Sequence, residues 1–67
     1  MVYYQVQFIA PIQGVWITVK EFDDSSGTLS PVFDSAEQLS LEEAETRLAF
    51  LSKKYPHIAF RINKVIL

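Results

Sequence analysis

"VYYQVQFIA", residues 2–10, alternates between two kinds of side chain with the period of two that is typical of a β-strand. The odd positions are interrupted by Gln5 and Gln7. The even positions are all apolar or aromatic: Val2, Tyr4, Val6, Phe8 and Ala10. We therefore expect a half-buried strand over residues 2–10 whose even side chains face the core.

A second strand is expected over residues 14–22, after a turn. Pro11 cannot donate a backbone hydrogen bond and Gly14 tolerates a positive φ, so "APIQG" is expected to connect the two strands as a β-hairpin. The second strand has two candidate inner faces, one with Val15, Ile17 and Val19, the other with Trp16, Thr18, Lys20 and Phe22. The alternation of apolar residues in the first strand favours the face with Val15, Ile17 and Val19 for the core. It places Trp16, the only tryptophan, on the opposite face of the sheet.

Residues 23–39 begin with the turn-forming run DDSSG and then show no clear period. They are predicted to form a long loop with at most a short extended piece at Val32 and Phe33. Ser40 and Glu43 form a capping-box pattern, which predicts a helix over residues 41–55. Pro56 would end that helix. A start at Ser35 satisfies the same pattern but ranks second, because the apolar stripe does not extend back that far.

The predicted helix is apolar along one side. At about 100° per residue, a stripe about 80° wide contains Leu41, Ala44, Leu48, Leu51 and Tyr55. Phe50 lies about 140° from the centre of this stripe. Either the long loop covers Phe50, or its ring is an exposed secondary contact for a partner.

Residues 57–66 return to a period of two. One face carries Ile58, Phe60, Ile62 and Ile66 and is interrupted by Lys64. The order β, β, α, β predicts a single α+β domain over residues 1–67, with one helix on one face of a three-stranded, mainly antiparallel sheet. We prefer the strand order 3-1-2, and parallel pairing of the third strand beside the second is the rival.

The chain is small and slightly acidic. Its 67 residues suffice for one domain that buries roughly 60% of its unfolded surface, so a partner that covers apolar surface would stabilise it. No cysteine is present, the first residues lack a basic region followed by an apolar stretch, and no apolar run approaches ~20 residues. These features predict a cytoplasmic protein. The net charge of -2 gives no general attraction to phosphates.

Side chains typical of binding surfaces fall on the sheet face that the helix leaves open. Tyrosine, tryptophan and arginine carry much of the energy of interfaces, because they desolvate a large area and keep a polar tip. The candidate binding residues are Tyr3, Trp16, Lys20 and Arg61, with Phe50 as the secondary contact. The first expectation is a partner protein. A homo-oligomeric accessory protein and weak binding of single-stranded nucleic acid remain as alternatives.

Catalytic and metal-binding patterns are absent from the sequence. His57 is the sole histidine, and Asp23 and Asp24 lack the spacing and the distal glutamate of a calcium loop. We therefore expect no enzyme activity, no metal, no cofactor and no small-molecule substrate.

Three stretches together resemble a pattern found in small uncharacterised bacterial and phage ββαβ accessory proteins. They are Trp16 in the second strand, the helix "SLEEAETRLAFLSKKYP" and the strand "IAFRI". The resemblance covers most of the chain. It implies an accessory protein of a mobile element that binds a host protein in the host cytoplasm, as an inhibitor or regulator.

Overall fold

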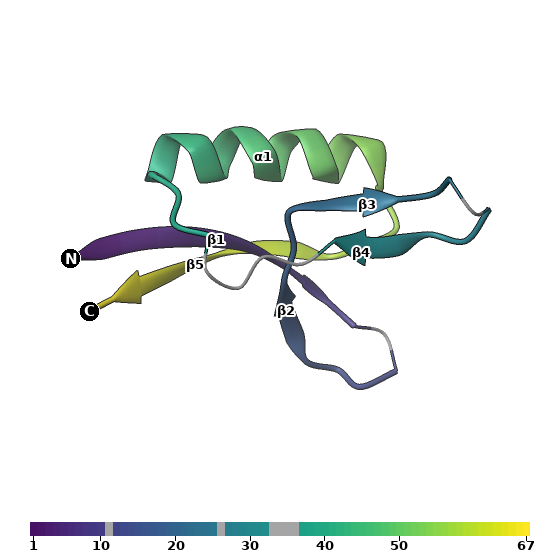
Figure 1. The fold of residues 1–67 in the computed structure, drawn as a ribbon, viewed down its shortest axis with the longest axis horizontal. Coiled ribbons are helices and arrows are strands. Elements are labelled where there is room, and N and C mark those ends of the chain that lie inside the picture. The colour runs from purple at the N-terminus through teal and green to yellow at the C-terminus, as the bar shows by residue number, and fades with distance from the viewer. Residues whose placement is uncertain (11, 26, 33–36) are drawn as a thin grey trace.

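The computed structural model describes residues 1–10, 12–25, 27–32 and 37–67. Its elements in chain order are β1 (Val2–Ile9), β2 (Trp16–Thr18), β3 (Glu21–Asp23), β4 (Ser30–Val32), α1 (Leu41–Lys54) and β5 (Phe60–Ile66). An antiparallel sheet in the order β2-β1-β5 lies beneath α1, and β3 and β4 form a separate two-stranded sheet (Figure 1). The predicted α+β class is confirmed, whereas the β3–β4 sheet was not expected.

Strand β1 is the centre of the larger sheet. It pairs with β5 along its length, from Val2 opposite Ile66 to Phe8 opposite Phe60. On its other side it pairs with β2 through residues 7–9. Further along that side, the amide of Tyr4 donates to the carbonyl oxygen of Leu39 at 2.8 Å, and Leu39 donates back at 3.0 Å. The preferred placement of the first strand between the second and the last is therefore confirmed.

The predicted second strand, residues 14–22, is wrong as one continuous element. Val19 still donates to the carbonyl oxygen of Val6 at 2.9 Å, but the amide of Lys20 donates to Val32 of β4 at 2.9 Å. The chain thus leaves the larger sheet after Val19 and continues as β3. The predicted loop over residues 23–39 is correspondingly wrong at Asp23, which lies in β3, and at Ser30 and Pro31, which lie in β4. Of the extended piece expected there, Val32 lies in β4 and Phe33 lies outside the described residues.

The break after Val19 turns Phe22 toward the core, which corrects its expected place on the open face. Its ring centroid lies 5.3 Å from that of Phe8, 4.9 Å from that of Tyr55 and 6.1 Å from that of Phe60. Such ring pairs contribute about 0.5–1.5 kcal/mol each beyond the area they bury. Phe22 therefore connects the small sheet to the larger one through Phe8 and Phe60, and to the end of α1 through Tyr55.

The turn after β3 is held by local hydrogen bonds. The amide of Ser25 donates to Oδ1 of Asp23 at 2.9 Å, and Gly27 closes the turn onto Asp24 with a φ of 81°. The backbone and side chain of Ser25 lower the pKa of Asp23 below its ordinary value. This interaction stabilises the fold above the ordinary pKa and is lost as the pH falls through the lowered one.

Helix α1 begins as the capping box predicts. The amide of Glu43 donates to the hydroxyl oxygen of Ser40 at 3.1 Å, and the amide of Ser40 donates to the Glu43 carboxylate at 3.1 Å. The helix ends at Lys54, one residue before the predicted end, and Tyr55 caps it. Ser35, the second-ranked start, lies outside the described residues. Leu39 is held in a β-bridge with Tyr4, so the helix does not extend back through it.

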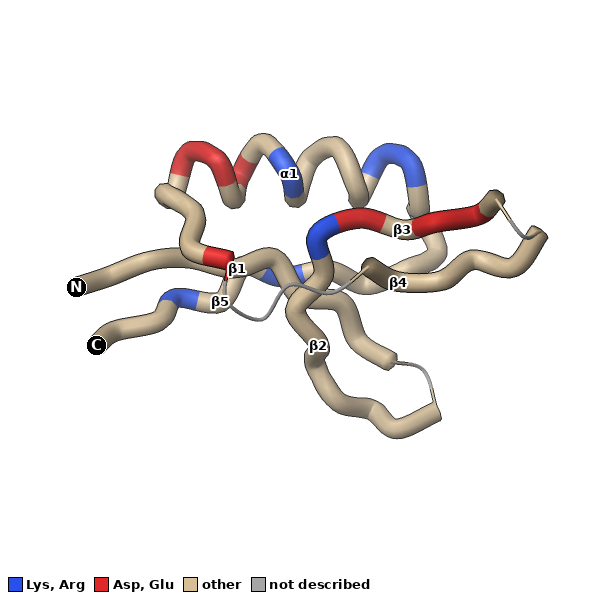
Figure 2. The backbone as a smooth tube through the Cα atoms, in the orientation of Figure 1, with Lys and Arg blue, Asp and Glu red and all other residues tan. Residues whose placement is uncertain are grey.

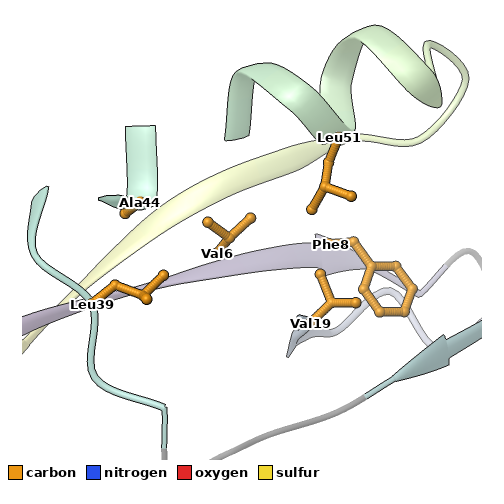
Figure 3. Close-up of a cluster of buried hydrophobic side chains, with 6 residues drawn as sticks. All are labelled: Val6, Phe8, Val19, Leu39, Ala44 and Leu51. Carbon is orange, nitrogen blue, oxygen red and sulfur yellow. The ribbon is translucent and has the colours of Figure 1, made fainter. Parts of the chain in front are cut away.

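The core lies between α1 and the larger sheet (Figure 3). Its buried apolar members are Val6, Phe8, Val19, Leu39, Ala44 and Leu51. Most of the predicted inward-facing residues belong to this core or pack against it, among them Ile58, Phe60 and Ile62. Residues 57–59 precede β5 rather than belonging to it, because Ile58 donates to Tyr55 in a turn.

Four residues expected in the core are exposed instead. Val15 is 51% exposed because it precedes β2, at the end of the hairpin turn. Val2 and Ile66 face each other where β1 and β5 project beyond α1, and they are 49% and 70% exposed (Figure 1). Leu41 begins the helix at the same end and is 44% exposed. The helix is too short to cover the whole of the β1–β5 ladder.

Two leucines of α1 provide a matched test of this packing. Leu51→Ala should lower the free energy of unfolding by about 3 kcal/mol, because the side chain is 2% exposed and its removal leaves a cavity. Leu41→Ala should cost under about 1 kcal/mol, because that side chain is already half in water. Urea denaturation monitored by circular dichroism measures both. Equal losses for the two variants would contradict the position of the core.

Candidate binding surface on the open sheet face

The side of the larger sheet that faces away from α1 carries alternate residues of three strands. From β1, β2 and β5 these are Tyr3, Gln5, Gln7, Ile9, Trp16, Thr18, Arg61, Asn63 and Val65. At the end near the hairpin, Ile9 lies opposite Trp16, and Gln7 lies between Thr18 and Arg61. We name the group Gln7, Ile9, Trp16, Thr18 and Arg61 the Trp16–Arg61 surface.

Arg61 and Trp16 form the main contact of this surface. The Cζ atom of Arg61 lies 4.4 Å from the centroid of the Trp16 ring. The two residues belong to β5 and β2, so the guanidinium group reaches diagonally across β1. Attraction between the cation and the face of the ring contributes about 0.5–1 kcal/mol at an exposed site. A half-buried tryptophan and an exposed arginine are thereby joined into one continuous patch.

Gln7 fixes the direction of the guanidinium group. The Nε–H of Arg61 donates to Oε1 of Gln7 at 2.9 Å. The amide nitrogen of Gln7 donates in turn to Thr18 Oγ1 at 3.4 Å, and Thr18 donates to Gln5 Oε1 at 3.2 Å. Among the described residues, the Nη groups of Arg61 have no acceptor. They remain able to donate to a further acceptor.

The far end of this hydrogen-bond chain reaches the segment before the helix. Nε2 of Gln5, a buried side chain, donates to the carbonyl oxygen of Glu37 at 3.3 Å, so its amide group has a hydrogen-bond partner. The carboxylate of Glu37 forms an ion pair with Arg47 of α1. The chain of polar contacts thus links the open face to the helix around the edge of the sheet.

Lys20 does not lie on the open face, and its predicted place there is wrong. It follows the break after Val19, where pairing with β4 carries it to the helix side of the molecule. There it lines a groove of about 650 Å³ between β3 and α1. The described residues around this groove are Lys20, Glu21, Leu39, Glu42, Glu43, Thr46, Arg47, Phe50 and Leu51.

Phe50 is exposed at the rim of the same groove. Its side chain is 61% exposed, and the Nζ atom of Lys54 lies 5.7 Å from its ring centroid. Within the described part of the chain, the segment between β3 and α1 does not cover the ring. The position of Phe50 therefore fits the reading of an exposed contact, on a different side of the molecule from the Trp16–Arg61 surface.

Tyr3 is separated from the other candidates on the open face. It lies opposite Val65, six residues before Ile9 along β1. At about 3.3 Å per residue, this places it about 20 Å from the row that contains Trp16. The structure therefore brings together two of the four predicted residues, Trp16 and Arg61. It adds Gln7, which strand parity placed on this face without identifying its role.

Charge is distributed unequally over the molecule (Figure 2). Acidic residues gather in the first turns of α1 and in β3, where Glu42, Glu43, Glu21 and Asp23 lie. Arg61 is the only charged side chain among the described residues of the open face. This face therefore offers one localised cation beside an aromatic ring.

Comparisons with protein-family models, with characterised proteins and with solved structures found no match to this chain. Over the described residues, no helix has the length and apolar character needed to cross a bilayer. In the same part of the chain, no three histidine, cysteine or acidic side chains are placed to hold a metal ion. The function is therefore inferred from the residues of the surface themselves.

The single tryptophan gives a direct measurement of the Arg61 contact. Arg61→Met should lower the free energy of unfolding by about 0.5–1 kcal/mol, and acrylamide should quench Trp16 fluorescence more strongly, because the guanidinium no longer covers the ring. Lys64→Met is the matched control, since it removes the same charge from β5 on the other face. Identical quenching in the two variants would refute the stacking.

Proposed function

We propose that this chain is a non-catalytic protein-interaction module that binds a partner protein through the Trp16–Arg61 surface. The observation that carries the proposal is the guanidinium of Arg61, held 4.4 Å from the Trp16 ring by a 2.9 Å hydrogen bond to Gln7. Tryptophan and arginine are the residue types in which interface energy is concentrated. Here both occur in one patch.

The side chain of Arg61 is already held in place in the free protein, which supports the use of this surface for binding. An arginine normally loses much rotamer freedom when a partner binds it, at a cost of about 0.5–1.5 kcal/mol. Arg61 already has its Nε–H bonded and its Cζ atom 4.4 Å from the centroid of the Trp16 ring, so less freedom remains to be lost. Its Nη–H groups can then donate to a carboxylate or carbonyl oxygen of the partner.

The size of the chain also favours binding over catalysis. A standard interface buries about 800 Å² on each partner, which is roughly a sixth of the 4660 Å² surface of this protein. One histidine and no cysteine provide few groups for acid-base or nucleophilic chemistry. The resemblance to phage and bacterial accessory proteins extends the proposal to an inhibitor or regulator that binds a host protein.

Binding of single-stranded nucleic acid is the weaker candidate. Two of the candidate binding residues, Lys20 and Arg61, are cations that could contact phosphates, but Lys20 lies on the other side of the molecule from Arg61. One cation on an acidic chain releases few counterions. A gel shift at low salt should show no retention of single-stranded DNA or RNA. Retention that Arg61→Met abolishes would favour nucleic acid over a protein partner.

The proposal is tested by matched variants in affinity capture from a cell extract, followed by measurement of affinity for the captured protein. Trp16→Ala combined with Arg61→Ala should weaken binding more than about tenfold, because each hot-spot residue costs over about 1 kcal/mol. Ile12→Ala, at a 95% exposed position in the hairpin turn, is the control and should bind as wild type. Unfolding curves show whether each variant is folded.

Two further variants test the candidate residues that lie outside the Trp16–Arg61 surface. Tyr3→Ala tests whether the contact extends about 20 Å along β1. Phe50→Ala, which should leave the melting temperature unchanged, tests the groove on the helix side. If the Trp16 and Arg61 double variant keeps every partner of the wild type, the Trp16–Arg61 surface is not the binding site.

A further inference from the structure

Strand β5 is an edge of the larger sheet. It pairs with β1 on one side, and among the described residues no segment pairs with its other side. Seven residues, Phe60–Ile66, therefore present their outward backbone groups to solvent. An edge of this length is a template for another strand unless it is covered or its charges oppose each other in the pairing. The charged residues of β5 are Arg61 and Lys64.

The hydrogen bonds to β1 reveal which residues of β5 point outward. Leu67 exchanges hydrogen bonds with Met1, and the amide of Ile9 donates to Ala59. In an antiparallel ladder such bonded pairs recur at every second residue, so the odd residues of β5 bond to β1. The backbone groups of the even residues point away from it: Phe60, Ile62, Lys64 and Ile66.

We propose that two copies of this chain pair through these outward groups, with their β5 strands antiparallel and Asn63 on the two-fold axis. In this register Phe60 bonds to Ile66 of the second copy, and Ile62 bonds to its Lys64. All four outward residues then find partners. A register centred on Ile62 leaves Ile66 without a partner in β5, and one centred on Lys64 opposes two lysines.

Side chains also match in this register. On the helix side, Ile66, which is 70% exposed, lies opposite the half-buried Phe60 of the second copy. The aliphatic part of the Lys64 side chain covers Ile62 of the second copy, and its charged ammonium group extends into water. On the open face, Arg61 lies opposite Val65 and the two Asn63 side chains meet. No like charges stand directly opposite each other.

The pairing would offset the thinness of the core. A chain of 67 residues leaves Ile66 exposed because α1 is too short to cover it, and a second copy covers it instead. The product is a continuous six-stranded sheet with both helices on one side. This inference does not depend on the Trp16–Arg61 surface, which remains accessible on the other side.

The assembly state is measured first by sedimentation equilibrium of the wild type up to millimolar concentration. We expect a mass of twice 7.7 kDa. Lys64→Pro removes one outward N–H and leaves the bonds to β1 intact, so it should give a folded monomer. Ile66→Lys, at an exposed position, should also dissociate the dimer without unfolding it. Trp16→Ala should not change the mass.

The register is measured with single cysteines, because the chain has none of its own. In the proposed pairing the two Asn63 residues are a non-hydrogen-bonded pair, with Cα atoms about 4.5 Å apart, which suits a disulfide. Asn63→Cys should therefore crosslink on oxidation, whereas Thr46→Cys on the exposed side of α1 should not. A monomeric wild type at millimolar concentration, a dimer that Lys64→Pro leaves intact, or a dimer that Asn63→Cys fails to crosslink would each overturn the proposal.

Discussion

The backbone pairing of β1 on both of its sides is the constraint on which the rest of this structure depends. A strand buried between two neighbours must bond its amides and carbonyls in both directions, because unpaired buried groups are costly. β5 fills one side completely, and the other is shared between β2 and Leu39. That division brings the segment before α1 against Tyr4, so the helix begins directly above the sheet. It also lets the chain leave the sheet after Val19 and place Phe22 in the core.

The parts of the fold that could be predicted from the sequence depend on short-range signals. Alternation in residues 2–10 identified the inner face of β1, and Ser40 with Glu43 located the start of α1 because the capping box is complete within one helical turn. The break after Val19 had only a weak signal of this kind. Glu21 interrupts the apolar positions Val15, Ile17 and Val19, and Phe22 falls on the other face, so the sequence indicates that the register changes near there. It does not indicate where the chain goes next, because Phe22 contacts Phe8, Tyr55 and Phe60, which are distant in sequence.

The sequence predicted most of the residues that lie on the open face, but not which of them contact each other. Parity assigns residues to a face, and Trp16 and Arg61 were correctly placed on the same one. Which residues touch depends on register, and register depends on the length of the hairpin turn and on the pairing of β5. These details brought Arg61 over Trp16 and left Tyr3 about 20 Å along β1. Lys20 was misplaced for the same reason as Phe22, since both follow the break.

Strand β5 shows how one alternation can serve two surfaces. Its odd residues bond to β1 and direct Arg61 toward the open face, while its even residues direct backbone groups outward and pack Phe60 and Ile62 against the core. Within β5, the side chain of Arg61 belongs to the Trp16–Arg61 surface, whereas the outward backbone groups of Phe60, Ile62, Lys64 and Ile66 form the free edge. Loss of the Arg61 side chain therefore removes the contact with Trp16, whereas loss of the outward N–H of Lys64 alters the free edge, so recognition of a partner and association between copies can be tested separately.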